Sequence, residues 1–286
     1  MKIPPVTLAA IWMGGALVSF MAMAVAGREL AGQLSTFQIL FFRSLVGVVV
    51  IGALAWRAGL EAIRPHSIGV HLVRNTAHFV GQAGWFYGIA FIPLAEVFAI
   101  EFTTPVWTAV LAIFLLGEKL TRPRVAAIGL GFLGILIILR PGLEIISPAA
   151  FAVLIGALGY ATSHTLTKRL TRDNGPLAIL FYMTVIQLPM GLVPSLADWA
   201  WPVGLQGWFW VCIVGVTAMT AHFSMVKAFG QADATVVVPM DFMRLPLIAL
   251  VGFMVYAEAV DIWLLLGAGL ILMGNLINLR AEKAAT

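Results

Sequence analysis

Two acidic residues lie inside long apolar stretches of this sequence, where a charge is costly to place. Glu101 falls in the apolar run 95–116, and Asp241 falls in the run 234–256, 140 positions further along. An ionisable side chain in the hydrocarbon core of a bilayer costs on the order of 3 kcal/mol by insertion scales, so such residues commonly serve a function. We interpret the two carboxylates as binding groups for a proton or a solute. The alternative is that they form structural ion pairs between helices.

Each of these acids has an arginine as a candidate partner. Arg43 lies at a depth in its apolar run similar to that of Glu101, and Arg244 follows Asp241 by three residues, on nearly the same helix face. The arginines could gate a route through the protein, clamp a solute carboxylate through two hydrogen bonds, or only neutralise the acids. We predict that Arg43–Glu101 and Asp241–Arg244 are two halves of one switch, in the outer and inner halves of the membrane.

A third apolar run carries a continuous polar and aromatic face. His78, Gln82 and Trp85 lie at positions i, i+4 and i+7 of the run 72–91, which places them on one side of a helix. In a membrane such a face must contact protein or a water-filled cavity. We therefore expect these three side chains to line a solute cavity.

The run 149–167 repeats this arrangement. Tyr160, His164 and Thr167 have the same spacing and are expected to face the same cavity. Trp107 could form a wall beside a planar solute, or it could pack against lipid or a neighbouring helix. His222 lies alone on its helix face and is expected to be a hydrogen-bonded packing residue.

The elements that would position these residues are membrane-spanning helices. The chain has 286 residues, of which 61% are hydrophobic and only 10% are charged, whereas a soluble domain carries about 25% charged residues. A helix of about 20 apolar residues crosses a bilayer, and there are ten apolar runs, at 5–25, 37–56, 72–91, 95–116, 124–139, 149–167, 177–196, 207–227, 234–256 and 261–279. We therefore predict an all-α integral membrane protein with ten transmembrane helices and no soluble catalytic domain.

The two halves of the chain repeat one pattern. Four residues recur at a constant offset of 140: Glu118, Gly129, Gly134 and Arg140 become Glu258, Gly269, Gly274 and Arg280. We infer two copies of one five-helix unit, at 1–142 and 147–286. Because five is an odd number of spans, the second copy must enter the membrane from the opposite side, which makes the repeats inverted, as in many transporters.

Basic residues predict the orientation. With the N-terminus inside, thirteen of the seventeen Lys and Arg residues fall in inner loops and tails, Arg74 among them, and two fall in outer loops. Cytoplasmic loops collect positive charge, so we expect a bacterial-type inner (plasma) membrane protein with both termini in the cytoplasm. This placement of Lys and Arg in cytoplasmic loops also explains the net positive charge of the chain, so we expect no nucleic-acid partner.

Several kinds of chemistry have no sequence signal here. There is no Walker A sequence, H-E-x-x-H or G-x-S-x-G motif, and Cys212 is the only cysteine. We expect no catalytic residues, no cofactor, no metal site and no ATP hydrolysis by this chain. The expected partners are a small-molecule solute, the lipid bilayer and protons, and the expected state is a monomer or a weak dimer.

One stretch carries a family resemblance. PLAEVFAIEFTTPVW at 93–107 is followed by LLGEKL at 115–120 and by a glycine-rich run that ends in RPG. With the duplication, this pattern resembles the EamA family of the drug/metabolite transporter superfamily over essentially the whole chain.

The resemblance implies secondary transport of a small organic metabolite by alternating access through a cavity between the repeats. Export of an amino acid or a related compound is the first reading. The alternatives are an uptake carrier for riboflavin, S-adenosylmethionine or nucleotide-like solutes, an intramembrane enzyme, or a channel.

Overall fold

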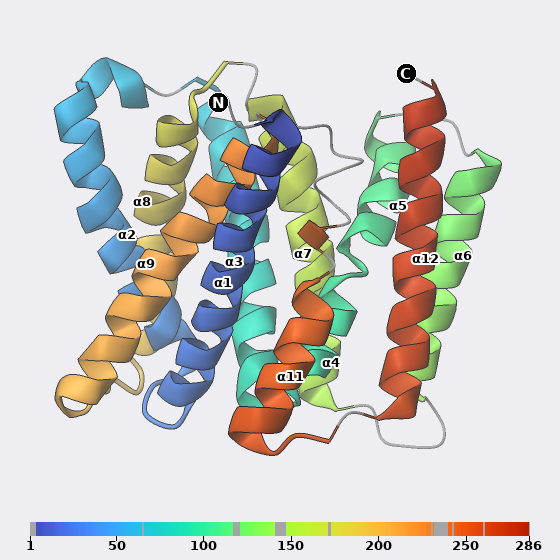
Figure 1. The fold of residues 1–286 in the computed structure, drawn as a ribbon. Coiled ribbons are helices and arrows are strands. Elements are labelled where there is room, and N and C mark those ends of the chain that lie inside the picture. The colour runs from blue at the N-terminus through green and yellow to red at the C-terminus, as the bar shows by residue number, and fades with distance from the viewer. Residues whose placement is uncertain are drawn as a thin grey trace.

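The structure is a bundle of helices, in which both chain ends lie at the same end of the bundle (Figure 1). This computed structural model describes residues 4–64, 66–116, 121–140, 147–170, 173–229, 231, 240–241, 243–259 and 261–285. The helices are α1 (Pro5–Ala31), α2 (Thr36–Ala58), α3 (Ile68–Phe91), α4 (Leu94–Glu101), α5 (Thr104–Leu116), α6 (Arg122–Leu139), α7 (Pro148–Leu170), α8 (Pro176–Ser195), α9 (Gly204–Phe229), α11 (Arg244–Tyr256) and α12 (Ile262–Ala285), with a short 3-10 helix, η1 (Leu60–Ile63). The described ranges contain no strand, which confirms the all-α prediction for them.

Within the described ranges, five helices are long and apolar enough to cross a membrane by themselves: α1, α2, α7, α8 and α9. Shorter apolar helices cover 125–139, 244–256 and 262–277. Helix α3 begins at Ile68, a turn before the predicted run 72–91, and it includes Arg74. This arginine was expected in a loop, but it lies inside α3 and is buried. Glu118 of the repeated pattern and residues 234–239 of the ninth run lie outside the described residues.

The predicted run 95–116 is divided into two helices. Pro105 has no N–H to bond the carbonyl of Glu101, so the regular ladder fails at that point. The Thr104 hydroxyl donates to this carbonyl instead, at 2.6 Å. Asn275 of α12 donates to the carbonyl of Phe102 at 3.0 Å. The break is therefore satisfied by side chains, and Glu101 becomes the last residue of α4.

Helix α4 lies in the interior of the bundle. Six of its eight residues are buried, and it packs against α3, α7, α11 and α12. Residues 240–241 are also helical, and α11 begins at Arg244. Two helix ends therefore meet inside the apolar bundle, and each carries an ionisable side chain.

Other close contacts join α1 to α9, α2 to α8, α3 to α7 and α6 to α12. The α3–α7 contact brings backbone against backbone. A Cβ atom added at Gly159 would lie 2.6 Å from the carbonyl oxygen of Ala77, and one at Gly84 would overlap that of Ala152. Small residues permit such close approach between membrane helices, so these glycines fix the α3–α7 distance.

We expect Gly84→Ala to lower the unfolding temperature of the purified protein clearly. The new methyl group would meet a main-chain oxygen, which cannot move without displacing α7, and overpacking of this kind costs about 1–3 kcal/mol. Gly14→Ala is the matched control, because a Cβ there meets nothing within 4 Å. Thermal unfolding in detergent compares the two variants, and equal unfolding temperatures would contradict the close contact.

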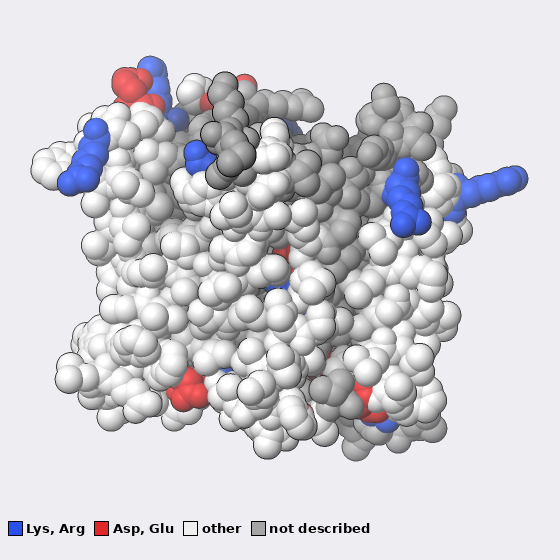
Figure 2. Space-filling view, in the orientation of Figure 1, with Lys and Arg blue, Asp and Glu red and all other residues white. Residues whose placement is uncertain are grey.

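Charge is distributed unevenly over the bundle. Most of the Lys and Arg side chains visible in Figure 2 lie at the end that carries both termini, and the middle belt is almost wholly uncharged. Large apolar side chains such as Val49, Phe253 and Leu265 are more than half exposed on the outside of the helices. An uncharged belt with exposed apolar side chains is typical of a surface that contacts lipid.

Candidate functional site

The centre of the bundle holds a cluster of three charged side chains. The Arg244 guanidinium lies between two carboxylates, with Nη2 at 2.6 Å from Asp241 Oδ2 and Nη1 at 3.4 Å from Glu101 Oε1. The three side chains are only 7%, 17% and 16% exposed for Arg244, Asp241 and Glu101 respectively. The Asp241–Arg244 contact is the one predicted from their spacing. Its extension to Glu101 joins the first half of the chain to the second.

The predicted Arg43–Glu101 pair is wrong for this structure. Glu101 is held by Arg244 and by Trp85, whose Nε1 donates to Glu101 Oε2 at 2.8 Å. The prediction compared depths along the two helices, but it did not fix the direction of either side chain around its helix. The break after α4 places Glu101 against the start of α11. The two acids therefore share one arginine, and they do not form separate outer and inner pairs.

Arg43 is buried, at 2% exposure, and contacts an amide instead of an acid. With the Gln82 amide oxygen oriented toward the guanidinium, Nη1 and Nη2 of Arg43 lie 2.9 and 3.0 Å from it. In this orientation the Gln82 amide nitrogen faces Gln187 Oε1 at 3.2 Å. The amide oxygen accepts from both terminal nitrogens of the guanidinium without neutralising its charge, and Nε has no hydrogen-bond partner among the described residues.

Aromatic rings enclose the Arg244 guanidinium. Its Cζ lies 4.6 Å from the ring centroid of Phe20, 5.6 Å from that of Phe98 and 5.2 Å from that of Phe102. A cation within about 6 Å of a ring centroid is attracted by the negative face of the ring. We call Phe20, Phe98, Phe102, Glu101 and Asp241 together the cation box.

Beside the cation box lies a cluster of neutral polar side chains. His78 Nδ1 is 3.1 Å from the Gln82 amide and 3.0 Å from Gln187 Nε2. The His78 ring lies edge-on to Tyr160 and to His222, with centroids 5.5 and 5.8 Å apart. The structure thus brings together the predicted faces of α3 and α7.

Two members of this cluster were not predicted as site residues from the sequence. Gln187 is fully buried in α8 and also donates to the carbonyl of Asn75 at 3.1 Å. The sequence feature that could have identified Gln187 is that it is a single amide residue within the apolar run 177–196. His222 bonds the carbonyl of Ala218 at 2.8 Å, as a packing histidine would, but its ring also contacts His78 and Phe20.

Tyr160 and His164 lie side by side on α7. Their rings are stacked, with centroids 6.3 Å apart and an interplanar angle of 17°. His164 is exposed and Tyr160 is half-buried, although Tyr160 also contacts the buried His78. The His164 ring therefore joins the polar face of α7 to the interior cluster through Tyr160. Thr167, one turn further, accepts a hydrogen bond from Arg74 Nε at 3.0 Å.

Trp107 lies apart from this site. Its ring packs edge-on against Phe132 of α6, with centroids 5.2 Å apart. Its Nε1 is buried without a hydrogen-bond partner among the described residues. Of the two readings open for this residue, packing against a neighbouring helix is the one that the contacts favour. Among the described residues, no group of three metal-ligating side chains is placed to hold a metal ion.

The end of the bundle opposite the termini is closed by polar contacts between the two halves of the chain. Arg28 Nη1 lies 3.0 Å from Glu258 Oε1, and the second Glu258 oxygen accepts from the backbone N–H of Leu94 at 2.9 Å. Tyr256 donates to Glu29 at 2.9 Å. Glu258 thus connects the segment after α11 to the last turn of α1 and to the start of α4.

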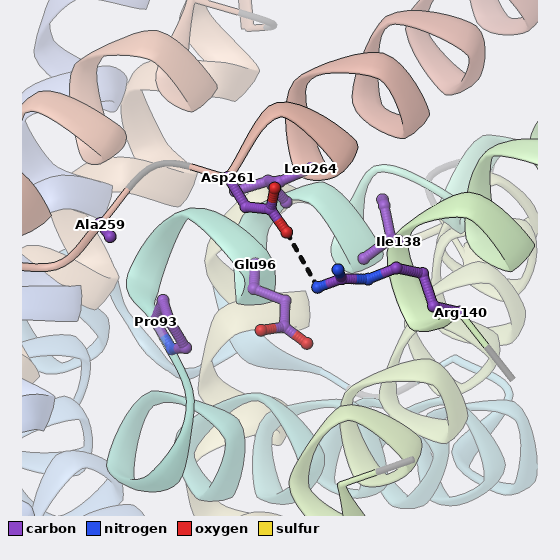
Figure 3. Close-up of a pocket in the computed structure, with 7 residues that line it drawn as sticks. All are labelled: Pro93, Glu96, Ile138, Arg140, Ala259, Asp261 and Leu264. Atoms are coloured by element: carbon purple, nitrogen blue, oxygen red, sulfur yellow. Dashed lines mark ion pairs between the residues drawn. The ribbon is translucent and has the colours of Figure 1, made fainter. Parts of the chain in front are cut away.

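A shallow pocket lies beside this closure (Figure 3). Its polar side chains are Glu96, Arg140 and Asp261, and Arg140 Nη2 lies 2.8 Å from Asp261 Oδ2. In Figure 3 the Glu96 side chain lies beside the Arg140–Asp261 pair. The pair links the end of α6 to the start of α12, so it adds to the polar closure of this end.

Comparison with known proteins identifies the family. The model of the EamA-like transporter family matches the chain twice, at residues 7–140 and 147–280. The S-adenosylmethionine uptake transporter of Rickettsia felis is 26% identical over 274 residues, covering 96% of this chain and 93% of that protein. The riboflavin transporter of Rhizobium johnstonii is 33% identical over 227 residues, covering 79% and 75%.

A solved structure shares the fold. One crystal structure superposes with a TM-score of 0.66 at 18% identity and covers 97% of this chain and 99% of its own. The double match of the family model spans nearly all of the sequence. This chain is therefore a member of the EamA-like transporter family.

Proposed function

We propose that this protein is an inner-membrane carrier that takes up a solute with a heterocyclic ring, of the riboflavin or S-adenosylmethionine type, by alternating access. The names of the two relatives support this class of solute, and the first of them is named for uptake. Export of an amino acid, the first reading of the resemblance, has no support in these names. Of the readings made from the sequence, the uptake alternative is the one we retain.

The observation that carries the proposal is the Glu101–Arg244–Asp241 cluster at the meeting point of two interrupted helices. Transporters commonly build their sites near the middle of the membrane from discontinuous helices that belong to different repeats. Here α4 ends at Glu101 and α11 begins at Arg244, and the ion pair between these two side chains links the two helices. A charged cluster in such a position is costly, and transport explains its presence.

The packing supports two inverted repeats, at 1–142 and 147–286, with ten spans in which α4 and α5 count as one. Shifting residue numbers by 140 exchanges the α1–α9 contact with the α3–α7 contact and maps the α2–α8 and α6–α12 contacts onto themselves. The same shift relates individual close approaches. A Cβ at Gly134 would lie 2.6 Å from the oxygen of Gly267, and a Cβ at Gly274 would lie 2.9 Å from that of Ala127. A two-fold relation between the repeats accounts for both.

We place both termini in the cytoplasm, because the end that carries them also carries most of the visible positive charge (Figure 2). The Arg28–Glu258 closure then lies on the outer side, and the stacked Tyr160 and His164 lie nearer the inner side. In this arrangement the protein is closed outward. Proton coupling is the drive that we propose, and the monomer is the proposed working unit.

We expect Tyr160→Leu to weaken solute affinity by about tenfold, since stacking of a base on an aromatic side chain contributes about 1–3 kcal/mol. Tyr87→Leu is the matched control, because Tyr87 is exposed on the outside of α3. Calorimetric titration of both purified variants measures the effect. Parent-like affinity in Tyr160→Leu would remove this residue from the site.

A stabilisation screen tests the solute class. The purified protein is heated with amino acids, nucleosides, flavins or S-adenosylmethionine, and the proposal expects the heterocyclic compounds alone to raise the unfolding temperature. Solute flux into vesicles that contain only this protein separates a carrier from an intramembrane enzyme. Stabilisation by amino acids alone would contradict this solute class and would favour transport of an amino acid instead.

A further inference from the structure

The Arg244 guanidinium occupies a position that has the chemistry to recognise an organic cation. Three phenylalanine rings lie 4.6–5.6 Å from its Cζ, and two carboxylates lie 2.6 and 3.4 Å from its nitrogens. Aromatic walls with nearby negative charge are the usual means of holding a quaternary or methylated cation. The three rings and two carboxylates are therefore sufficient to bind an organic cation, and in this structure the Arg244 guanidinium occupies their site.

The charge of the box is not balanced. In their ionised forms, Glu101 and Asp241 supply two negative charges against the single positive charge of Arg244. The second oxygen of Asp241, Oδ1, is buried and has no hydrogen-bond partner in the described part of the chain. Arg43 does not supply the missing charge by contact, because its guanidinium nitrogens face the Gln82 amide. The box can therefore accept one more positive charge.

We propose that Arg244 is a tethered placeholder, which in the empty carrier occupies the ring faces that the positively charged group of the solute takes on binding. This inference rests on the proposed function and narrows it to a nucleoside-like cation of the sulfonium type, in preference to a neutral flavin. A sulfonium group has no N–H, so it uses the ring faces and the negative field. Arg244 keeps its hydrogen bond to Asp241 while it gives up the rings.

Displacement of the Arg244 guanidinium from the rings would also weaken a contact between the two halves of the chain. Of the two Arg244 ion pairs, the one with Glu101 is longer, at 3.4 Å against 2.6 Å, and it is the one that crosses between the two halves of the chain. A solute cation on the ring faces loosens this longer contact first. Binding would thereby release one link between α4 and α11, which couples occupancy of the site to the change of state.

Two probes that differ in one methyl group and one charge test the inference. S-adenosylmethionine carries a sulfonium, and S-adenosylhomocysteine is the uncharged thioether. In calorimetric titration of the full-length protein, the sulfonium should bind at least about tenfold more tightly. Phe20→Leu and Asp241→Asn should each reduce this ratio to about threefold or less. Phe79→Leu, at a buried ring outside the box, should leave the ratio unchanged.

Equal affinities of the parent for the two probes would overturn the inference, and so would a ratio that survives in both Phe20→Leu and Asp241→Asn. Failure of the parent to bind the sulfonium would overturn it as well. Binding and transport of riboflavin distinguish failure of the placeholder role from failure of the proposed carrier function. If the parent binds and transports riboflavin without sulfonium preference, the proposed carrier function stands and only the placeholder role is lost.

Discussion

Replacing Arg244 by glutamine is expected to abolish transport and to lower the free energy of unfolding by about 3–5 kcal/mol, because removing one partner leaves buried charge uncompensated. The side chain is 7% exposed and is the only described cation in contact with Glu101 and Asp241. Without it, two carboxylates would face each other among phenylalanine rings. Chemical unfolding in detergent and vesicle flux measure the two effects.

A second variant separates loss of folding from loss of function. Arg244→Gln combined with Asp241→Asn returns the cluster to one net negative charge, as in the parent, so most of the stability should return while transport stays absent. Arg244→Lys keeps the charge but loses the planar fork and its stacking, so an intermediate result is expected. A parent-like stability and flux in Arg244→Gln would show that the cluster is dispensable.

Glu258→Gln is expected to open the outer side of the protein. The carboxylate forms an ion pair with Arg28 and accepts a hydrogen bond from the Leu94 backbone N–H, and these contacts join the two halves of the chain. A loss of about 1.4 kcal/mol in the closed state shifts the balance of states tenfold. We therefore expect a cysteine at Ala95, which is 5% exposed in the closed structure, to react about tenfold faster with an impermeant reagent added outside.

The labelling is done with Cys212 replaced by serine. Glu61→Gln is the matched control, because Glu61 pairs with Arg64 at a fully solvated position, where the side chain is 89% exposed. An ion pair of that kind contributes little, so the control should label like the parent. If Glu258→Gln also labels at the parent's rate, the contact is not part of the closure.

Residue spacing in the sequence predicted contacts within one helical turn, but contacts between residues far apart in the chain could be identified only from the structure. Asp241 and Arg244 are one helical turn apart, so their contact follows from periodicity alone. The same reasoning placed Tyr160 and His164 together, and they are stacked. The Arg43–Glu101 pair failed because similar depth in two helices says nothing about which neighbour each side chain faces.

The interruption of the run 95–116 shows a second limit. Pro105 was visible in the sequence, but proline alone does not decide between a kink and a break. The outcome depends on Asn275, which lies in α12 and reaches the Phe102 carbonyl. Gln187 was missed for a similar reason, since only the tertiary contact with His78 distinguishes it from an isolated polar residue.

Counterflow in vesicles that contain only this protein tests the central claim most directly. Vesicles are loaded with unlabelled S-adenosylmethionine or riboflavin, and the labelled solute is added outside. The parent is expected to accumulate the label transiently and saturably, and the folded Arg244→Gln/Asp241→Asn variant is expected not to. A folded parent without saturable flux of either solute, or equal flux in the double variant, would contradict a carrier that works through this site.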